Sequence, residues 1–146
     1  MKTFFLFLAL SITYLGTMKT CSAQPPQWVS DLADEVLPFD VSSITSWEEK
    51  QVTWYNVDDQ PGADSVTANT LVIKGTTTSG NYFTGRIPVT NHELSALGTG
   101  IESDSCEGQC GCQKCEFKRN EVGCDNCGDC ISTGCTCWCK HTRTRG

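Results

Sequence analysis

The strongest constraint in this sequence is a run of cysteines near its end. Ten cysteines fall between Cys106 and Cys139 with the spacing C-x3-C-x-C-x2-C-x8-C-x2-C-x2-C-x4-C-x-C-x-C. The rest of residues 106–146 offers very few large apolar side chains, so burial alone cannot hold this segment together. Covalent bridges or metal must stabilise it, and each closed loop of about 15 residues contributes roughly 3 kcal/mol in the loop-entropy model.

The first 23 residues have the layout of a secretory signal peptide. Lys2 precedes an apolar run over residues 4–15, and small residues at positions 21–23 predict cleavage after Ala23. Cleavage would remove Cys21 and leave an even number of cysteines, which an oxidising compartment can pair completely. No later apolar stretch is long enough to span a bilayer. We therefore expect a secreted, extracellular protein with no membrane span.

The export signal favours disulfides over metal for the ten cysteines, although their connectivity stays open. The C-x2-C and C-x-C pairs are also the way in which thiolate clusters hold zinc or copper, and the density resembles that of metallothioneins, so a thiolate metal-binding protein remains an alternative. We expect no metal and no cofactor. The predicted disulfide cysteines are Cys106, Cys110, Cys112, Cys115, Cys124, Cys127, Cys130, Cys135, Cys137 and Cys139.

Charge divides the chain where the cysteines begin. Residues 24–105 carry twelve Asp or Glu against three Lys or Arg, a net charge of −9, whereas residues 106–146 have a net charge of +1. The break predicts a signal peptide over 1–23, an acidic cysteine-free domain over 24–105 and a cysteine-rich module with a basic tail over 106–146. The whole chain has a net charge of −6, which argues against a nucleic-acid partner.

The cysteine-free segment has the pattern of a small β domain. Apolar residues at helical spacing from Trp28 to Val36, followed by Pro38, predict a short helix over 28–37. Residues 51–57, 65–74 and 81–89 are typical of strands, the first followed by a turn signal at 58–62. The predicted fold class is mainly β: a small antiparallel β domain with one short helix, followed by an irregular disulfide-rich module.

Within residues 52–84, three short motifs resemble parts of an immunoglobulin-like domain: the strand C tryptophan, an apolar pair of strand E and the tyrosine corner. These motifs are Val52-Thr53-Trp54-Tyr55, Leu71-Val72-Ile73 and Gly80-Asn81-Tyr82. The cysteines that usually bridge that fold are absent, and Thr84 stands in place of the second. The resemblance implies extracellular protein recognition through loops or a sheet face, with no catalytic residues.

Catalysis finds little support in the sequence. The chain has two histidines, His92 and His141, and no G-x-S-x-G turn to present a nucleophile. His92 is followed by Glu93, but the second histidine of a zinc H-E-x-x-H motif is missing, so we expect His92 to be a surface loop residue. Asp58 and Asp59 are explained by turn formation. The sequence therefore predicts a protein that is not an enzyme.

The leading hypothesis is a secreted disulfide-rich protein that binds an extracellular protein or matrix, in the manner of recognition, toxin-like or defence-like modules. Rigid scaffolds lose little entropy when they bind, and aromatic and arginine side chains are favoured anchors. Alternatives are a structural component of the extracellular matrix and an acidic precursor of a cysteine-rich peptide. The predicted contact patch, expected to be exposed, consists of Trp138, Lys140, His141, Arg143 and Arg145.

Overall fold

A computed structural model describes residues 24–55, 65–95, 97, 100–118, 121–127 and 138–145. It confirms a mainly β protein with one short helix and a following cysteine-rich region. The predicted signal peptide, the turn at 58–62 and Cys130, Cys135 and Cys137 lie outside the described residues.

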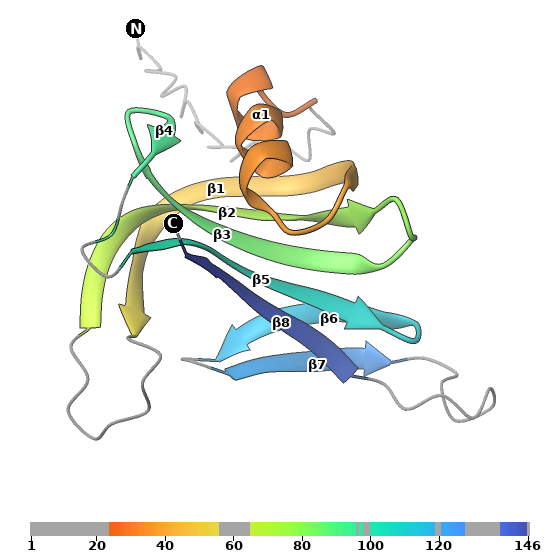
Figure 1. The fold of residues 1–146 in the computed structure, drawn as a ribbon. Coiled ribbons are helices and arrows are strands. Elements are labelled where there is room, and N and C mark those ends of the chain that lie inside the picture. Colours follow the sequence, from red (N-terminus) through yellow and green to blue (C-terminus); the bar gives the residue numbers. More distant parts are fainter. Residues whose placement is uncertain are drawn as a thin grey trace, which may run out of the picture.

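The helix α1 (Gln27–Val36) forms where the sequence predicts it. Its buried face consists of Val29, Leu32, Ala33 and Val36, which recur every three or four residues. The backbone becomes extended at Leu37, the residue before Pro38, as expected from the steric clash that proline imposes on its predecessor. The helix lies across one face of the sheet (Figure 1).

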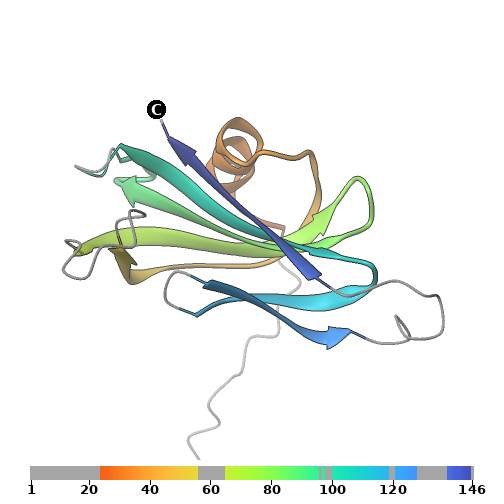
Figure 2. The same cartoon turned by 60° about the horizontal axis from the view of Figure 1, so that its bottom comes forward.

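The main sheet is antiparallel and has the strand order β1-β2-β3-β5-β8, with the short β4 paired to β3. Its members are β1 (Val41–Tyr55), β2 (Ser65–Thr77), β3 (Tyr82–Thr90), β4 (Glu93–Leu94), β5 (Ile101–Gln109) and β8 (Trp138–Arg145). A separate hairpin of β6 (Cys112–Lys118) and β7 (Glu121–Cys127) lies on the face opposite α1 (Figures 1 and 2). The sheet therefore separates the helix from the cysteine-bearing hairpin.

The first strand is much longer than the sequence predicts, because β1 pairs with β2 along its whole length. Two register irregularities interrupt that pairing, between Val41 and Ser43 and between Ile44 and Ser46. Gly75 makes this close approach possible: a Cβ atom there would lie 1.9 Å from the carbonyl oxygen of Ser43. The absence of a side chain at Gly75 thus permits the bend of β1 over β2.

The core has two parts. Under α1, apolar side chains of β2 and β3 pack against the helix, including Ile73, Phe83 and Ile87. A smaller cluster unites Trp54 at the end of β1 with Leu97 and Ile101.

Strand β5 runs across the predicted domain boundary at 105/106. It pairs with β3 on one side and with β8 on the other, so residues on both sides of that boundary share one sheet. The sequence predicts a separate cysteine-rich module over 106–146, whereas in the structure β8 of that module belongs to the same sheet as β1, β2 and β3. The composition of the chain changes at residue 105, but the strand pairing of the main sheet continues across that position.

Candidate functional site

A disulfide attaches the β6–β7 hairpin to the main sheet. Cys106 of β5 is bonded to Cys115 of β6, and both side chains are buried. The hydroxyl of Thr84, on the neighbouring strand β3, donates a hydrogen bond of 2.6 Å to the carbonyl oxygen of Cys115. The covalent bridge and this hydrogen bond together fix β6 over the face of the sheet opposite α1.

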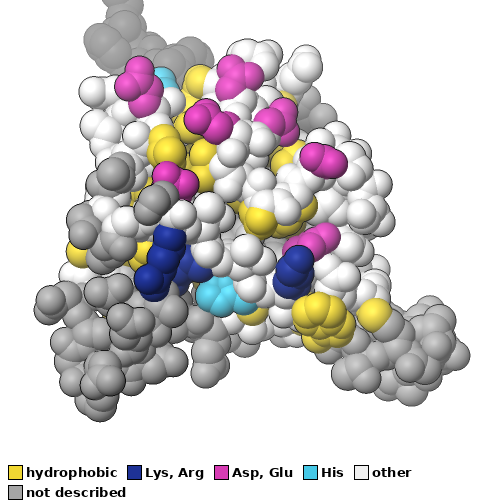
Figure 3. Space-filling view, viewed as in Figure 1, with side chains coloured by type: hydrophobic (Ala, Val, Ile, Leu, Met, Phe, Trp, Pro, Cys, Tyr) yellow, Lys and Arg dark blue, Asp and Glu magenta, His cyan; other side chains and the backbone are white. Residues whose placement is uncertain are grey.

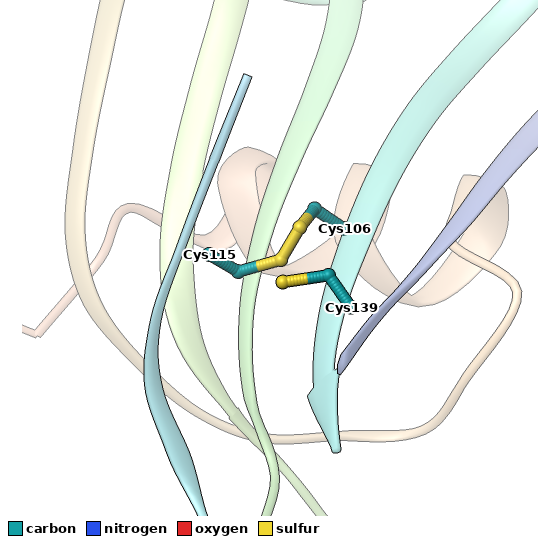
Figure 4. A group of neighbouring side chains, drawn as sticks. All are labelled: Cys106, Cys115 and Cys139. Carbon is teal, nitrogen blue, oxygen red and sulfur yellow. A yellow bond between two sulfur atoms is a disulfide. The ribbon is translucent and has the colours of Figure 1, made fainter. Parts of the chain in front are cut away.

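Cys139 of β8 connects this bridge to a second group of sulfur atoms. Its sulfur lies within 4.8 Å of the sulfurs of Cys106 and Cys115, toward which its side chain points (Figure 4). It lies equally close to those of Cys112 and Cys124. Five sulfur atoms from β5, β6, β7 and β8 therefore form one cluster, and Cys139 belongs to both of its halves.

The pairing within the second group is not unique. The sulfur of Cys124 is at bonding distance from both Cys112 and Cys139, and it can form a disulfide with one of them at a time. Cys110, in the turn before β6, is also disulfide-bonded. These close pairs support the predicted disulfide-rich character for the described cysteines; the side chain of Cys127 lies outside the described residues.

On the same face of the sheet, a buried carboxylate binds three basic side chains. Asp104 of β5 is fully buried and stands between Arg86 of β3 and Arg143 of β8 in the strand register. The Nη2 atoms of Arg86 and Arg143 donate to Oδ2 of Asp104 over 2.5 Å and 2.9 Å. The ring of His141 contacts Oδ1 of the same carboxylate.

Aromatic rings enclose this ion network. The guanidinium carbon of Arg86 lies 3.9 Å from the ring centroid of Phe117 on β6 and 5.1 Å from that of Trp54 on β1. Arg143 donates a further hydrogen bond of 3.0 Å to the carbonyl oxygen of Tyr55. The network thus links the end of β1, the centre of the sheet, the hairpin and the last strand.

Burial and charge act in opposite directions on Asp104. Burial raises the pKa of its carboxyl, but hydrogen bonds from His141 and Arg143 and the charges of both arginines outweigh burial and leave the pKa below its ordinary value. For Arg86, burial lowers the pKa and the nearby Asp104 offsets only part of that effect. The carboxylate is therefore the ionised centre of the network at neutral pH.

The structure corrects the expectation that five basic and aromatic residues of the C-terminal segment form one exposed patch. Successive side chains of β8 point to opposite faces of the sheet. Arg143 is 9% exposed and His141 29%, and both bind Asp104. Trp138 and Lys140 are exposed on the other face, and Arg145 is exposed near the end of β8. Arg143 is therefore a largely buried ion partner, whereas His141 contacts Asp104 from an exposed position. Whether the exposed residues bind a partner stays a prediction.

His92 is on the surface, in the turn between β3 and β4, as the sequence predicts, but it is also held in place. Its ring stacks on Trp28 of α1 with 4.3 Å between centroids, and its Nε2 lies 3.3 Å from Glu49. A shallow groove of about 430 Å³ borders this pair, with Asp31 and Glu35 among its lining residues. Figure 3 shows acidic side chains over the upper part of this face and basic ones below them.

Sequence reasoning missed the ion network. Arg86 is the one charged residue of β3, between the apolar Phe83 and Ile87, and that position was a usable signal for a buried charge. Asp104, by contrast, lies among small polar residues that look solvent-exposed. Only the pairing of β5 between β3 and β8 makes Asp104 the partner of both arginines.

The fold and the site define a class: an antiparallel β protein with a helix on one face and a disulfide-linked hairpin on the other. Comparison with protein-family models, with curated proteins and with solved structures gives no match. The immunoglobulin-like resemblance of residues 52–84 therefore stays a prediction. Among the described residues, no helix is long and apolar enough to cross a membrane.

Proposed function

We propose that this chain is a secreted, non-enzymatic protein that binds an extracellular protein through the α1-side face of β8. The observation that carries the proposal is Trp138, a large hydrophobic side chain that is 51% exposed on β8, next to Cys139, whose sulfur is at bonding distance from Cys124. Exposed tryptophans are favoured anchors in protein interfaces, because they bury much apolar area at little entropic cost. Export rests on the signal-peptide pattern of residues 1–23.

The neighbourhood of Trp138 adds polar groups suited to the rim of an interface. Lys140, two residues further along β8, is exposed on the same face and stands opposite Glu107 in the strand register. Glu107 in turn accepts a hydrogen bond of 2.9 Å from Asn81. A partner with an apolar pocket and a carboxylate beside it would complement Trp138 and Lys140.

Rigidity is the second support for this proposal. Strand β8 pairs with β5 from Arg145 to Trp138, and Cys139, between Trp138 and Lys140, belongs to the sulfur cluster. The backbone that carries both side chains is thus fixed before binding, which reduces the entropy lost on association. The resemblance of residues 52–84 to immunoglobulin-like motifs implies the same kind of role.

Export and oxidation are tested first. The chain is expressed with its own N-terminus in cells with a secretory pathway, and the medium is analysed by intact mass with and without reductant. We expect a protein that begins at Gln24 and is lighter by about 10 Da than its reduced form, one hydrogen for each of ten bridged cysteines. Retention in the cell with residues 1–23 attached would refute export.

Binding is tested with the same secreted protein against a panel of displayed extracellular domains. Trp138→Ala and Lys140→Ala should weaken binding to a captured partner. Tyr82→Ala is the matched control, since Tyr82 is 45% exposed and lies on another strand. Equal binding by the Trp138 variant and the wild type would reject the proposed face. Recovery of the protein from an insoluble matrix fraction would favour the structural alternative. Recovery of a chain cut near residue 105 would favour the precursor alternative.

A further inference from the structure

A small pocket lies in the corner between the main sheet and the β6–β7 hairpin. It has a volume of about 220 Å³ and is lined by residues of β1, β2, β3 and β6. Drug-sized ligands occupy pockets of about 300–1,000 Å³, so this one suits a small molecule or one ring of a larger one. Neither the Trp138 face nor the ion network of Asp104 includes this pocket.

The walls of the pocket are held by contacts that do not depend on a ligand. On the hairpin side, Cys115 is bonded to Cys106 of β5, and the hydroxyl of Thr84 donates a hydrogen bond to the carbonyl oxygen of Cys115. On the β1 side, the hydroxyl of Thr45 donates a hydrogen bond of 3.2 Å to the carbonyl oxygen of Lys74. A pocket that is formed before binding loses little entropy when a ligand enters.

The side chains at the pocket combine positive charge with an aromatic ring. Lys74 stands opposite Thr84 in the strand register and Tyr82 lies two residues before Thr84, so both side chains lie on the hairpin side of the sheet. Tyr82 is 45% exposed and lines the pocket. Lys114 of β6 lines it as well and is paired with Glu116 over 2.9 Å.

The charge around the pocket differs from that of the chain as a whole. No acidic residue lines the pocket, although the chain has a net charge of −6. Residues 24–105 contain three basic residues; Lys50 and Arg86 are each paired with a carboxylate, whereas the described residues supply none for Lys74. A concave site with an unpaired ammonium group and no acid favours an anionic ligand.

We propose that this pocket binds an acidic sugar, a pyranose ring that carries a sulfate or a carboxylate group. The C–H face of the ring packs on Tyr82, because an aromatic ring offers a flat apolar surface. The acidic group pairs with the ammonium of Lys74, and Lys114 adds to the positive potential. The side-chain amide of Gln113 donates and accepts hydrogen bonds and the hydroxyl of Thr45 accepts them, which suits neighbouring sugar hydroxyls.

This inference goes beyond the proposed function and does not depend on it. The pocket lies on the hairpin side of the sheet, whereas Trp138 and Lys140 lie on the α1 side. The two surfaces can therefore be tested separately on the same protein.

The experiment uses the oxidised, secreted chain and isothermal titration with four probes. A sulfated chondroitin disaccharide and sialyllactose supply the two kinds of acidic sugar, lactose supplies a neutral sugar, and inorganic sulfate supplies the anion alone. We expect at least one acidic sugar to bind more tightly than both lactose and inorganic sulfate, and its binding to weaken as salt is added. Inorganic sulfate bound as tightly as the acidic sugars, or no binding of either acidic sugar, would overturn the inference.

Variants show whether binding occurs in this pocket. Lys74→Ala should weaken binding of the acidic sugar by about tenfold or more, as expected for a lost hydrogen bond to a charged group, and Tyr82→Ala should weaken it as well. Lys140→Ala is the matched control, an exposed lysine on the α1 side, and should bind the sugar as the wild type does. The urea midpoint of each variant shows that the fold is intact. Equal affinities of the Lys74 and Lys140 variants would reject this pocket, whereas failure of Trp138 to bind a protein partner would leave these measurements unaffected.

Discussion

Replacement of Asp104 by asparagine tests the buried ion network most directly. Asparagine has nearly the same shape, so Asp104→Asn leaves no cavity. It removes the only carboxylate that the structure shows between Arg86 and Arg143, whose side chains are each 9% exposed. The new amide group would also place its own N–H donors against the donors of His141 or the arginines.

The size of the effect follows from burial. Breaking a buried ion pair from one side costs about 3–5 kcal/mol, since the remaining charge stays buried without a partner. An exposed pair contributes only about 0.2–1 kcal/mol. A domain of this kind has a total stability of about 5–15 kcal/mol, so Asp104→Asn should remove a large part of it.

Urea unfolding followed by tryptophan fluorescence measures this cost, because Trp54 is buried beside Arg86. Glu48→Gln is the control: Glu48 pairs with Lys50, and these side chains are 57% and 49% exposed. A double-mutant cycle with Arg143→Met should show that Asp104→Asn costs less once one of the buried cations is gone. A loss below about 1 kcal/mol with an unchanged urea dependence would refute the reasoning.

Three further predictions concern Asp104, Gly75 and the disulfides. The pKa of Asp104 is lowered in the folded state, so its contribution to stability is present above the ordinary aspartate pKa of about 3.9 and is lost as the pH falls through the lowered value. In acid titrations, the wild type should therefore lose more stability than Asp104→Asn below about pH 4. Parallel stability curves for the two proteins would contradict this. Gly75→Ala should lower the urea midpoint strongly, because the new Cβ would meet the carbonyl oxygen of Ser43 at 1.9 Å. Ser79→Ala, in the exposed turn after β2, is the control and should change the midpoint little. Equal midpoints for the two variants would show that β1 can move away from position 75. A thiol reductant should destabilise the whole main sheet, including the surroundings of Trp54, because the cysteine-bearing strands β5 and β8 belong to that sheet. An unchanged fluorescence of Trp54 would show instead that residues 24–105 fold independently.

The sequence by itself was sufficient for local features. The spacing of Val29, Leu32 and Val36 with Pro38 behind them determines an amphipathic helix, since helical periodicity and the proline clash act within a few residues. Alternating apolar residues around Phe83 and Ile87 likewise indicate a strand, although the structure buries both of its faces rather than one. The cysteine density predicted a cross-linked segment, because so little apolar material accompanies it.

Only the tertiary structure decided which residues meet across long sequence distances. The pairing of β5 with both β3 and β8 brings Arg86, Asp104 and Arg143 into one row across the sheet. No local sequence pattern around Asp104 predicts these two partners. The same register turns Arg143 inward, where the sequence suggested an exposed contact, and brings Cys139 to the bridge between Cys106 and Cys115. Composition and periodicity act along the chain, whereas strand order and register depend on how the whole sheet buries its apolar faces and pairs its charges.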